Sequence, residues 1–201
     1  EIFARCASTP GGFEHEPDRR GFHTVSAEER RAFWEDLYAK PGFGIWLGNF
    51  RETFMDEEAN AELSAFIADK IRERVKDPAV AEKLIPKDHG FGVQRVPLET
   101  NYYEVYNRDN VRLVDISDQG APIETFNEAG IRTAGGEQFD LDIIVYATGF
   151  DAMTGAFDRF DIRGAGGQKL KDKWADGRET FFGLLVNGFP NFVMLAGPQS
   201  G

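Results

Sequence analysis

The stretch of sequence that decides the fold is DIIVYATG, residues 142–149. Its apolar run from Ile143 to Ala147 is nearly unbroken, which is typical of a strand buried on both faces in a parallel sheet. The run leads directly into Thr148 and Gly149. Ligands of open α/β folds bind at the carboxyl ends of strands, where glycine allows close approach of the backbone. Because a glycine after a strand is common, this feature alone indicates a site only weakly.

Segments on both sides of this stretch predict further strands. They are residues 111–115, 122–126, 130–133, 137–139 and 191–196. The third and fourth of these predict a hairpin around residues 134–136, and the last is a second apolar run that we expect to be buried.

The first third of the chain has helical periodicity. Ser26 and Glu29 have the spacing of a capping box, which predicts a helix that continues to Pro41. A longer helix is predicted from the acidic start at residue 56 until Asp77, and a short one over residues 78–85. The apolar face of the longer helix is Leu63, Phe66, Ile67, Ile71 and Val75. The sequence therefore predicts an α/β protein with a helical insertion at its front.

Composition excludes several classes of partner. The net charge is −11, and acidic residues are interleaved with the basic ones, so nucleic acid is not an expected partner. No apolar stretch approaches the length of a membrane span, and no secretory leader is evident. A single cysteine, Cys6, fits a reducing, cytoplasmic compartment. The first residues look like the middle of a helix and the last follow a core strand directly, so we expect both ends to be cuts in a longer chain.

Several familiar kinds of site are absent from the sequence. The histidines, His15, His23 and His89, are far apart, which argues against a metal centre. No Gly-x-Ser-x-Gly elbow and no Gly-x-Gly-x-x-Gly fingerprint occurs. The glycines of residues 164–167 lack the spacing of a phosphate-binding loop and fit an exposed hairpin loop better. If the protein binds a nucleotide cofactor, its phosphate-binding turn lies outside this sequence.

An ordered set of motifs carries a resemblance to a known family. The stretch DLDIIVYATGFDAMTG at residues 140–155 resembles the second signature of Baeyer–Villiger monooxygenases, ATGFDA-x-TG. Residues 95–104 (RVPLETNYYE) and 106–111 (YNRDNV) are similar to stretches that precede this signature in the family. Further matches in the family's order are residues 22–26, 77–84 and 161–164, Trp174, residues 188–191, Gly197 and Pro198. The resemblance covers essentially the whole chain.

The resemblance implies a flavoprotein with two Rossmann-like dinucleotide-binding domains, one for FAD and one for NADP. Residues 1–90 would be the helical insertion of the NADP-binding domain, residues 91–149 the rest of that domain, and residues 150–201 the start of the returning FAD-binding domain. Both glycine-rich fingerprints and the family's central signature would precede residue 1. The implied reaction inserts one oxygen atom of O₂ next to a ketone carbonyl, with FAD and NADPH as cofactors, and yields an ester or lactone.

By resemblance, Arg95 matches the active-site arginine of the family. A fixed cation beside the flavin would stabilise the negative charge that develops during oxygen insertion, and arginine does not lose its proton. From the residues alone, the alternative is a surface arginine paired with Glu99 or Glu104. Gln94 stands where family members often carry a lysine that helps to bind the 2′-phosphate of NADPH. Glutamine brings no charge, so preference for NADPH over NADH is less firmly implied.

Two further segments are candidates for cofactor contact. The resemblance places Ala147, Thr148, Gly149 and Phe150 beside a cofactor. It also places Gly197 and Pro198 near the flavin or the substrate cavity, although an ordinary turn explains those two residues equally well.

Two alternative functions remain open. The first is a related flavin monooxygenase that oxygenates nitrogen or sulfur; by resemblance those enzymes lack an arginine at position 95 and usually the FDA-x-TG continuation. The second is a non-catalytic descendant domain that folds alone and binds no nucleotide. Isolated strands of a divided sheet would expose unpaired edges, which argues against this second alternative. The sequence indicates neither the ketone nor the oligomeric state.

Overall fold

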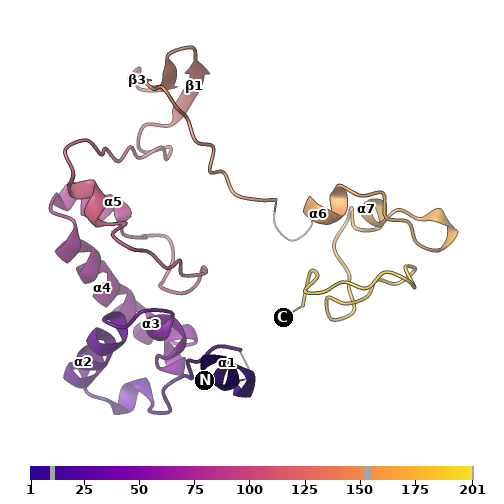
Figure 1. Cartoon of the computed structure of the whole chain (residues 1–201), viewed down its shortest axis with the longest axis horizontal. Coiled ribbons are helices and arrows are strands. Elements are labelled where there is room, and N and C mark those ends of the chain that lie inside the picture. The colour runs from indigo at the N-terminus through magenta and orange to yellow at the C-terminus, as the bar shows by residue number, and fades with distance from the viewer. Residues whose placement is uncertain (10–11, 152–154, 201) are drawn as a thin grey trace. The chain divides into compact units, whose positions relative to one another are not determined.

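The computed structural model describes residues 1–9, 12–151 and 155–200. These residues form two compact units, Glu1–Phe139 and Asp140–Gly201 (Figure 1). Residues 152–154 of the ATGFDA-x-TG motif lie outside the described residues.

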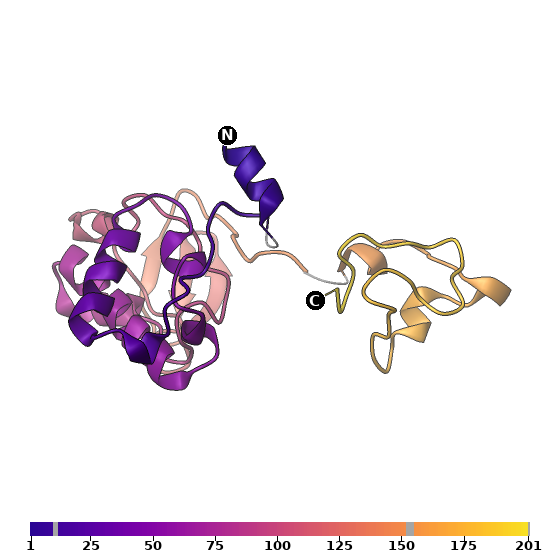
Figure 2. The same cartoon turned by 90° about the horizontal axis from the view of Figure 1, so that it is seen from below.

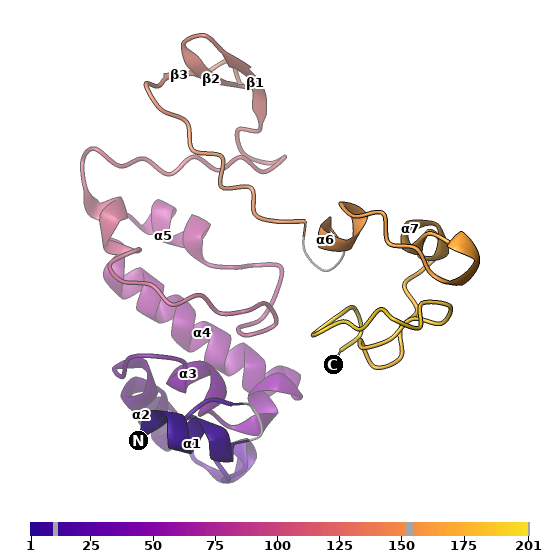
Figure 3. The same ribbon diagram turned by 45° about the vertical axis from the view of Figure 1, so that its right-hand side comes forward.

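The first unit is mainly helical. Its helices are α1 (Ile2–Ser8), α2 (Ala27–Tyr38), α3 (Gly44–Leu47), α4 (Glu57–Arg74) and α5 (Pro78–Leu84), with 3₁₀ turns at Phe22–Thr24, Arg51–Phe54 and Glu104–Asn107. Within this unit α4 is the longest helix and extends from the turn Arg51–Phe54 to α5 (Figure 3). Helix α1 contributes no buried residue and projects from the other helices of the unit (Figure 2).

Capping residues fix where these helices begin. The Ser26 hydroxyl accepts from the Glu29 amide while the Glu29 carboxylate accepts from the Ser26 amide, so the predicted capping box of α2 is confirmed. Asp56 accepts from the Ala59 amide at 2.9 Å and caps α4. Pro78 occupies the first turn of α5, where its missing N–H removes no helical bond. All three predicted helices are confirmed.

The predicted apolar face of α4 is buried. Leu63 and Phe66 join Phe22, Trp34 and Phe50 in one core cluster. A second cluster consists of Ile71, Val75 and Ala81, where the end of α4 packs on α5. Ile67 is only partly buried and packs against both clusters.

The first unit also carries a small sheet. Strands β1 (Ile123–Asn127), β2 (Gly130–Thr133) and β3 (Gln138–Asp140) lie in the order β1-β2-β3 (Figure 3). The pairing of β1 with β2 is antiparallel, with Asn127 opposite Gly130. The strand predicted at residues 122–126 is confirmed as β1. The predicted hairpin is confirmed as β2 and β3, which are neighbours in the sheet, and the Thr133 amide donates to the Glu137 carbonyl at 2.9 Å.

Three other strand predictions were wrong. Residues 111–115, 142–147 and 191–196 form no strand in the structure. Val145 of the second run is 81% exposed. A strand exists only through backbone bonds to a neighbour, and no described residue pairs with residues 142–147. An apolar run shows that a segment is suited to burial, but the run does not supply the neighbour that would bury it.

The second unit has short elements around a compact cluster. It contains α6 (Gly155–Asp158), a 3₁₀ turn at Ala165–Gly167 and α7 (Leu170–Lys173). Its core consists of Leu170, Trp174, Val186, Phe189 and Met194. The glycines of residues 164–167 form a loop between Arg163 and Lys169, which are paired by an antiparallel bridge, as the sequence predicted. None of the helices described in either unit has both the length and the apolar character needed to cross a bilayer.

Candidate functional site

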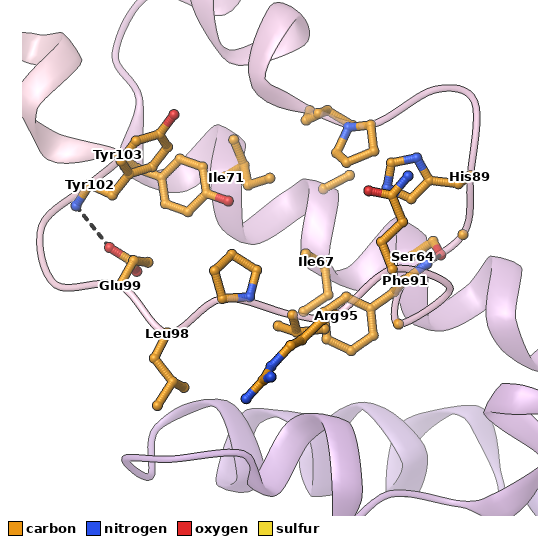
Figure 4. A pocket seen from close by; sticks show the side chains of 18 residues that line it. Ser64, Ile67, Ile71, His89, Phe91, Arg95, Leu98, Glu99, Tyr102 and Tyr103 are labelled. Carbon is orange, nitrogen blue, oxygen red and sulfur yellow. Dashed lines mark hydrogen bonds between the residues drawn. The ribbon is translucent and has the colours of Figure 1, made fainter. Parts of the chain in front are cut away.

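A cavity of about 550 Å³ lies in the first unit beside α4. One wall is α4, with Ser64, Ile67 and Ile71, and the other is the segment between residues 85 and 103 (Figure 4). The lining is mainly apolar and aromatic with few polar groups, which is the usual character of a small-molecule or cofactor site.

Gln94 and Arg95 line this cavity together. Both are exposed and lie in a stretch without regular secondary structure. No ion pair or hydrogen bond of the Arg95 guanidinium is found among the described residues, and no dashed line reaches it in Figure 4. Arg95 is also the only arginine or lysine among the described residues that line the cavity. The cavity therefore carries one permanent, unpaired positive charge.

Polar side chains of α4 hold the start of this stretch. Asn60 donates to the Phe91 carbonyl at 2.9 Å, and the Ser64 hydroxyl accepts from the Phe91 amide at 2.9 Å. The Asn60 amide also donates to the Thr53 carbonyl at 2.7 Å. Residue 90 must be small for this approach, because a Cβ on Gly90 would lie 1.8 Å from Asn60 Oδ1.

Arg74 holds the end of the same stretch. Its guanidinium donates to both oxygens of Glu104, at 2.6 and 2.8 Å, and to Glu99 at 2.7 Å. It also donates to the Tyr38 hydroxyl at 3.0 Å and stacks over the Tyr103 ring, 4.9 Å from its centre. These bonds, first that of Glu104, raise the pKa of Arg74, and Arg74 in turn lowers the pKa of Glu99 and of Glu104.

This network contradicts one reading of Arg95. The sequence left open that Arg95 pairs with Glu99 or Glu104, and in the structure both carboxylates bind Arg74 instead. Sequence reasoning did not identify Arg74 as part of the site. Its contacts with Glu99 and Glu104 span 25 and 30 residues, and nothing local in the sequence marks them.

Tyrosine side chains complete one side of the cavity. Tyr102 and Tyr103 line it, and the Tyr106 hydroxyl donates to the Tyr102 hydroxyl at 3.1 Å. Burial, with that hydrogen bond, raises the pKa of Tyr106 to about 12, and burial raises the pKa of Tyr103. The hydroxyls of Tyr103 and Tyr106 are therefore protonated at neutral pH and add no negative charge near Arg95.

The remaining candidate residues belong to the second unit, in two separate segments. Ala147, Thr148, Gly149 and Phe150 are exposed, and Phe150 is 99% exposed. Gly149 has φ +81°, a conformation that disfavours any residue with a side chain.

Gly197 and Pro198 are buried in a turn. A Cβ on Gly197 would lie 2.5 Å from the Gly183 carbonyl oxygen, and the Pro198 carbonyl accepts from the Thr180 hydroxyl at 2.7 Å. Within this unit these two residues therefore have a structural role in closing the turn.

One group of possible metal ligands was not expected from the sequence. Ligand atoms of His23, Asp56 and Glu58 lie within 4.8 Å of one another. Asp56 already accepts from the Ala59 amide and contacts His23 at 3.3 Å. These groups serve the start of α4, and the positive end of a helix dipole does not favour a cation.

The cavity residues fit part of a dinucleotide. Within the described residues Arg95 offers an uncompensated charge and Gln94 an amide without a hydrogen-bond partner, and aromatic rings form the wall beside them. This set suits a planar, anionic ligand. The glycine-rich turn that would bind a pyrophosphate does not occur in the sequence, so these residues would contact only a portion of such a ligand.

Comparison with known proteins identifies close relatives, although no family model matches the chain. The 2-oxo-Δ3-4,5,5-trimethylcyclopentenylacetyl-CoA monooxygenase of Pseudomonas putida is 56% identical over 100% of this chain and 36% of its own length. A protein of Pseudooceanicola batsensis named Baeyer–Villiger monooxygenase is 42% identical over 98% of this chain and 36% of its own length. The chain thus spans about 36% of the length of the curated relatives it matches.

A solved structure agrees over the same extent. The crystal structure of OTEMO in complex with FAD and NADP superposes with a TM-score of 0.94, at 55% identity, covering 100% of this chain and 36% of that chain. This likeness, together with the mixed helices and strands, confirms the predicted fold class: an α/β chain that corresponds to part of a flavoprotein binding FAD and NADP.

Proposed function

We propose, from the premise that the chain is a relative of the Baeyer–Villiger monooxygenases, that it forms part of an FAD- and NADPH-dependent enzyme of this kind. The whole enzyme would insert one oxygen atom of O₂ next to the carbonyl of a small ketone and release an ester or lactone. The chain alone would lack most of the cofactor-binding surface, since it spans about 36% of the matched relatives.

The observation that carries this proposal is the unpaired Arg95 in the cavity beside α4. The carboxylates closest to Arg95 in its sequence stretch, Glu99 and Glu104, bind Arg74 instead. A guanidinium without a competing carboxylate, as found for Arg95 among the described residues, can stabilise negative charge in a bound ligand. Its position in the RVPLETNYYE stretch matches the family's active-site arginine, so we assign it the catalytic role.

Other residues would hold the cofactors. When bound, FAD supplies the oxygen-activating chemistry and NADPH the reducing equivalents. In this chain Gln94 would hydrogen-bond a phosphate oxygen of NADPH, and Arg95 would hold the developing negative charge close to the flavin. We also propose contacts to a cofactor from Ala147, Thr148, Gly149 and Phe150, and an indirect contribution from the turn that contains Gly197 and Pro198.

The proposed domain layout follows the resemblance. Residues 1–90 would be the helical insertion of the NADP-binding domain, 91–149 the remainder of that domain, and 150–201 the start of the returning FAD-binding domain. The acidic composition supports small molecules rather than nucleic acid as partners, and the single cysteine supports a cytoplasmic location.

The full-length protein provides the test. A visible absorption spectrum of the purified protein should show a bound flavin, and addition of a simple ketone such as cyclopentanone should increase NADPH oxidation and yield a lactone. Oxygenation of an amine or sulfide without any reaction of ketones would favour the nitrogen- or sulfur-oxygenating alternative. A colourless protein that binds no nucleotide would refute the proposal.

A further inference from the structure

Arg74 and Arg95 differ in their pairing: Arg74 binds Glu99 and Glu104, whereas Arg95 has no ion pair among the described residues. Glu99 is four residues from Arg95, and both side chains line the same cavity (Figure 4). Glu99 nonetheless directs one oxygen to Arg74 at 2.7 Å and the other to the Tyr102 amide at 2.8 Å. Each of its two oxygens thus accepts from a partner other than Arg95.

The ion pairs of Arg74 with Glu99 and Glu104 have the geometry of strong interactions. Its contact with Glu104 is bidentate, and the Arg74 side chain is only 22% exposed. Bidentate arginine–carboxylate pairs are both stronger and more directional than pairs made by lysine. The backbone of Arg74 is fixed as well, because its carbonyl accepts from the Asn107 side chain at 2.7 Å.

The stretch that carries Arg95 has little backbone structure of its own. Between Gln94 and Leu98 no backbone hydrogen bond joins it to the described residues. The stretch is held at Phe91 by Asn60 and Ser64, and at Glu99 by Arg74. Without the bond from Arg74, the Glu99 carboxylate would keep only the Tyr102 amide as a partner, on the same short segment as the unpaired Arg95.

We propose that Arg74 is a positioning residue that sequesters Glu99 and so keeps the Arg95 guanidinium unpaired and available to an anionic ligand. This inference rests on the proposed function for its catalytic consequence. Loss of Arg74 would release the Glu99 carboxylate, which would then pair with Arg95 and neutralise it. Arg74 would thereby act on the reaction through Arg95 without touching substrate or cofactor.

The experiment uses the full-length holoenzyme and three variants: Arg74→Gln, the double variant Arg74→Gln/Glu99→Gln, and Arg72→Gln as the matched control. Arg72 is on the same helix and pairs with Glu82 and Asp69, away from the cavity. Glutamine at position 99 still has an oxygen that can accept from the Tyr102 amide, but it carries no charge to neutralise Arg95.

Crystal structures provide the first readout, which is independent of activity. In Arg74→Gln a carboxylate oxygen of Glu99 should lie within hydrogen-bonding distance of the Arg95 guanidinium. A structure in which Glu99 stays away from Arg95 would overturn the proposal, even if the variant is less stable. Because this readout needs no turnover, it stands whether or not the parent protein oxygenates ketones.

Product formation per NADPH oxidised is the second readout. We expect Arg74→Gln to lower this ratio on the order of tenfold, which is less than the loss expected when the stabilising charge of Arg95 itself is removed. The double variant should recover a ratio close to that of the parent, and Arg72→Gln should leave the ratio unchanged. Apparent Tm and flavin content are measured alongside. If the double variant recovers thermal stability but not the product ratio, Arg74 has only a structural role and the proposal fails. A parent that forms no ester refutes the proposed function instead.

Discussion

Replacement of Asn49 by alanine tests how the helical core is held together. Asn49 is 1% exposed, and its Oδ1 accepts from Trp34 Nε1 at 2.9 Å and from the Phe50 amide at 2.8 Å. Alanine leaves both of these buried donors without a partner. Each unsatisfied buried donor costs about 1–3 kcal/mol, so we expect Asn49→Ala to lose roughly 2–6 kcal/mol of stability. The lost bond from Asn49 Nδ2 to the Ile45 carbonyl, 3.1 Å, adds to this cost.

Thermal melting of the full-length holoenzyme measures this effect, with Asn110→Ala as the matched control because Asn110 is an exposed asparagine. The control should change stability by no more than about 0.5 kcal/mol. A second variant isolates the indole bond: Trp34→Phe removes the donor, so combining it with Asn49→Ala should cost less than the sum of the two single changes. An unchanged melting temperature in Asn49→Ala, or strict additivity in the double variant, would refute the reasoning.

Three further predictions concern the approach to the cavity, the cofactor preference and the response to acid. Gly90→Ala places a Cβ 1.8 Å from Asn60 Oδ1, so we expect a lowered melting temperature and weaker NADPH binding, whereas equal values would show that the segment adapts freely. Gln94→Lys adds a positive charge at the proposed phosphate contact. It should raise the ratio of kcat/KM for NADPH to kcat/KM for NADH by about tenfold, which corresponds to ~1.4 kcal/mol. An unchanged ratio would show that residue 94 does not contact the 2′-phosphate. The Arg72 guanidinium lowers the pKa of Glu82 to about 2 in the folded protein, from about 4.3 in the unfolded chain. The ionised Glu82 carboxylate therefore stabilises the fold fully above the unfolded pKa, and this stabilisation is lost as the pH falls through the folded pKa. Melting temperatures of Glu82→Gln should therefore depend less on pH over that window than those of the parent, and parallel curves would contradict the linkage.

The sequence predicted the helices well because their signals are local. The Ser26 and Glu29 capping box and the Asp56 cap each act within one helical turn, and all of them are present in the structure. The strand β1 and the hairpin of β2 and β3 were also predicted, since the turn residues and the two strands of this hairpin are adjacent in sequence. Local chemistry was sufficient wherever an element and its partner lie close together along the chain.

Residues whose partners are distant were predicted less well. The apolar run at residues 142–147 was predicted as a buried strand, but its burial depends on neighbours that are not among the described residues. The sequence left open a pair of Glu99 with Arg95, four positions away, whereas in the structure Glu99 binds Arg74, 25 positions away. Sequence spacing identified Arg95, Glu99 and Glu104 but not Arg74, because only the folding of α4 against the 91–104 segment brings Arg74 to these carboxylates.

The most direct test of the central claim is the rate of lactone formation from cyclopentanone by full-length protein carrying Arg95→Ala. Because Arg95 is exposed and has no ion pair or hydrogen bond of its guanidinium within the described part of the chain, its removal should leave the flavin content and the melting temperature close to those of the parent. Loss of one stabilising charge at a reacting centre predicts a fall of about 10²–10³-fold in the rate, with Arg95→Lys between the two. A variant that forms lactone at the parental rate would contradict the assignment of Arg95 and, with it, the account of this cavity as the catalytic site.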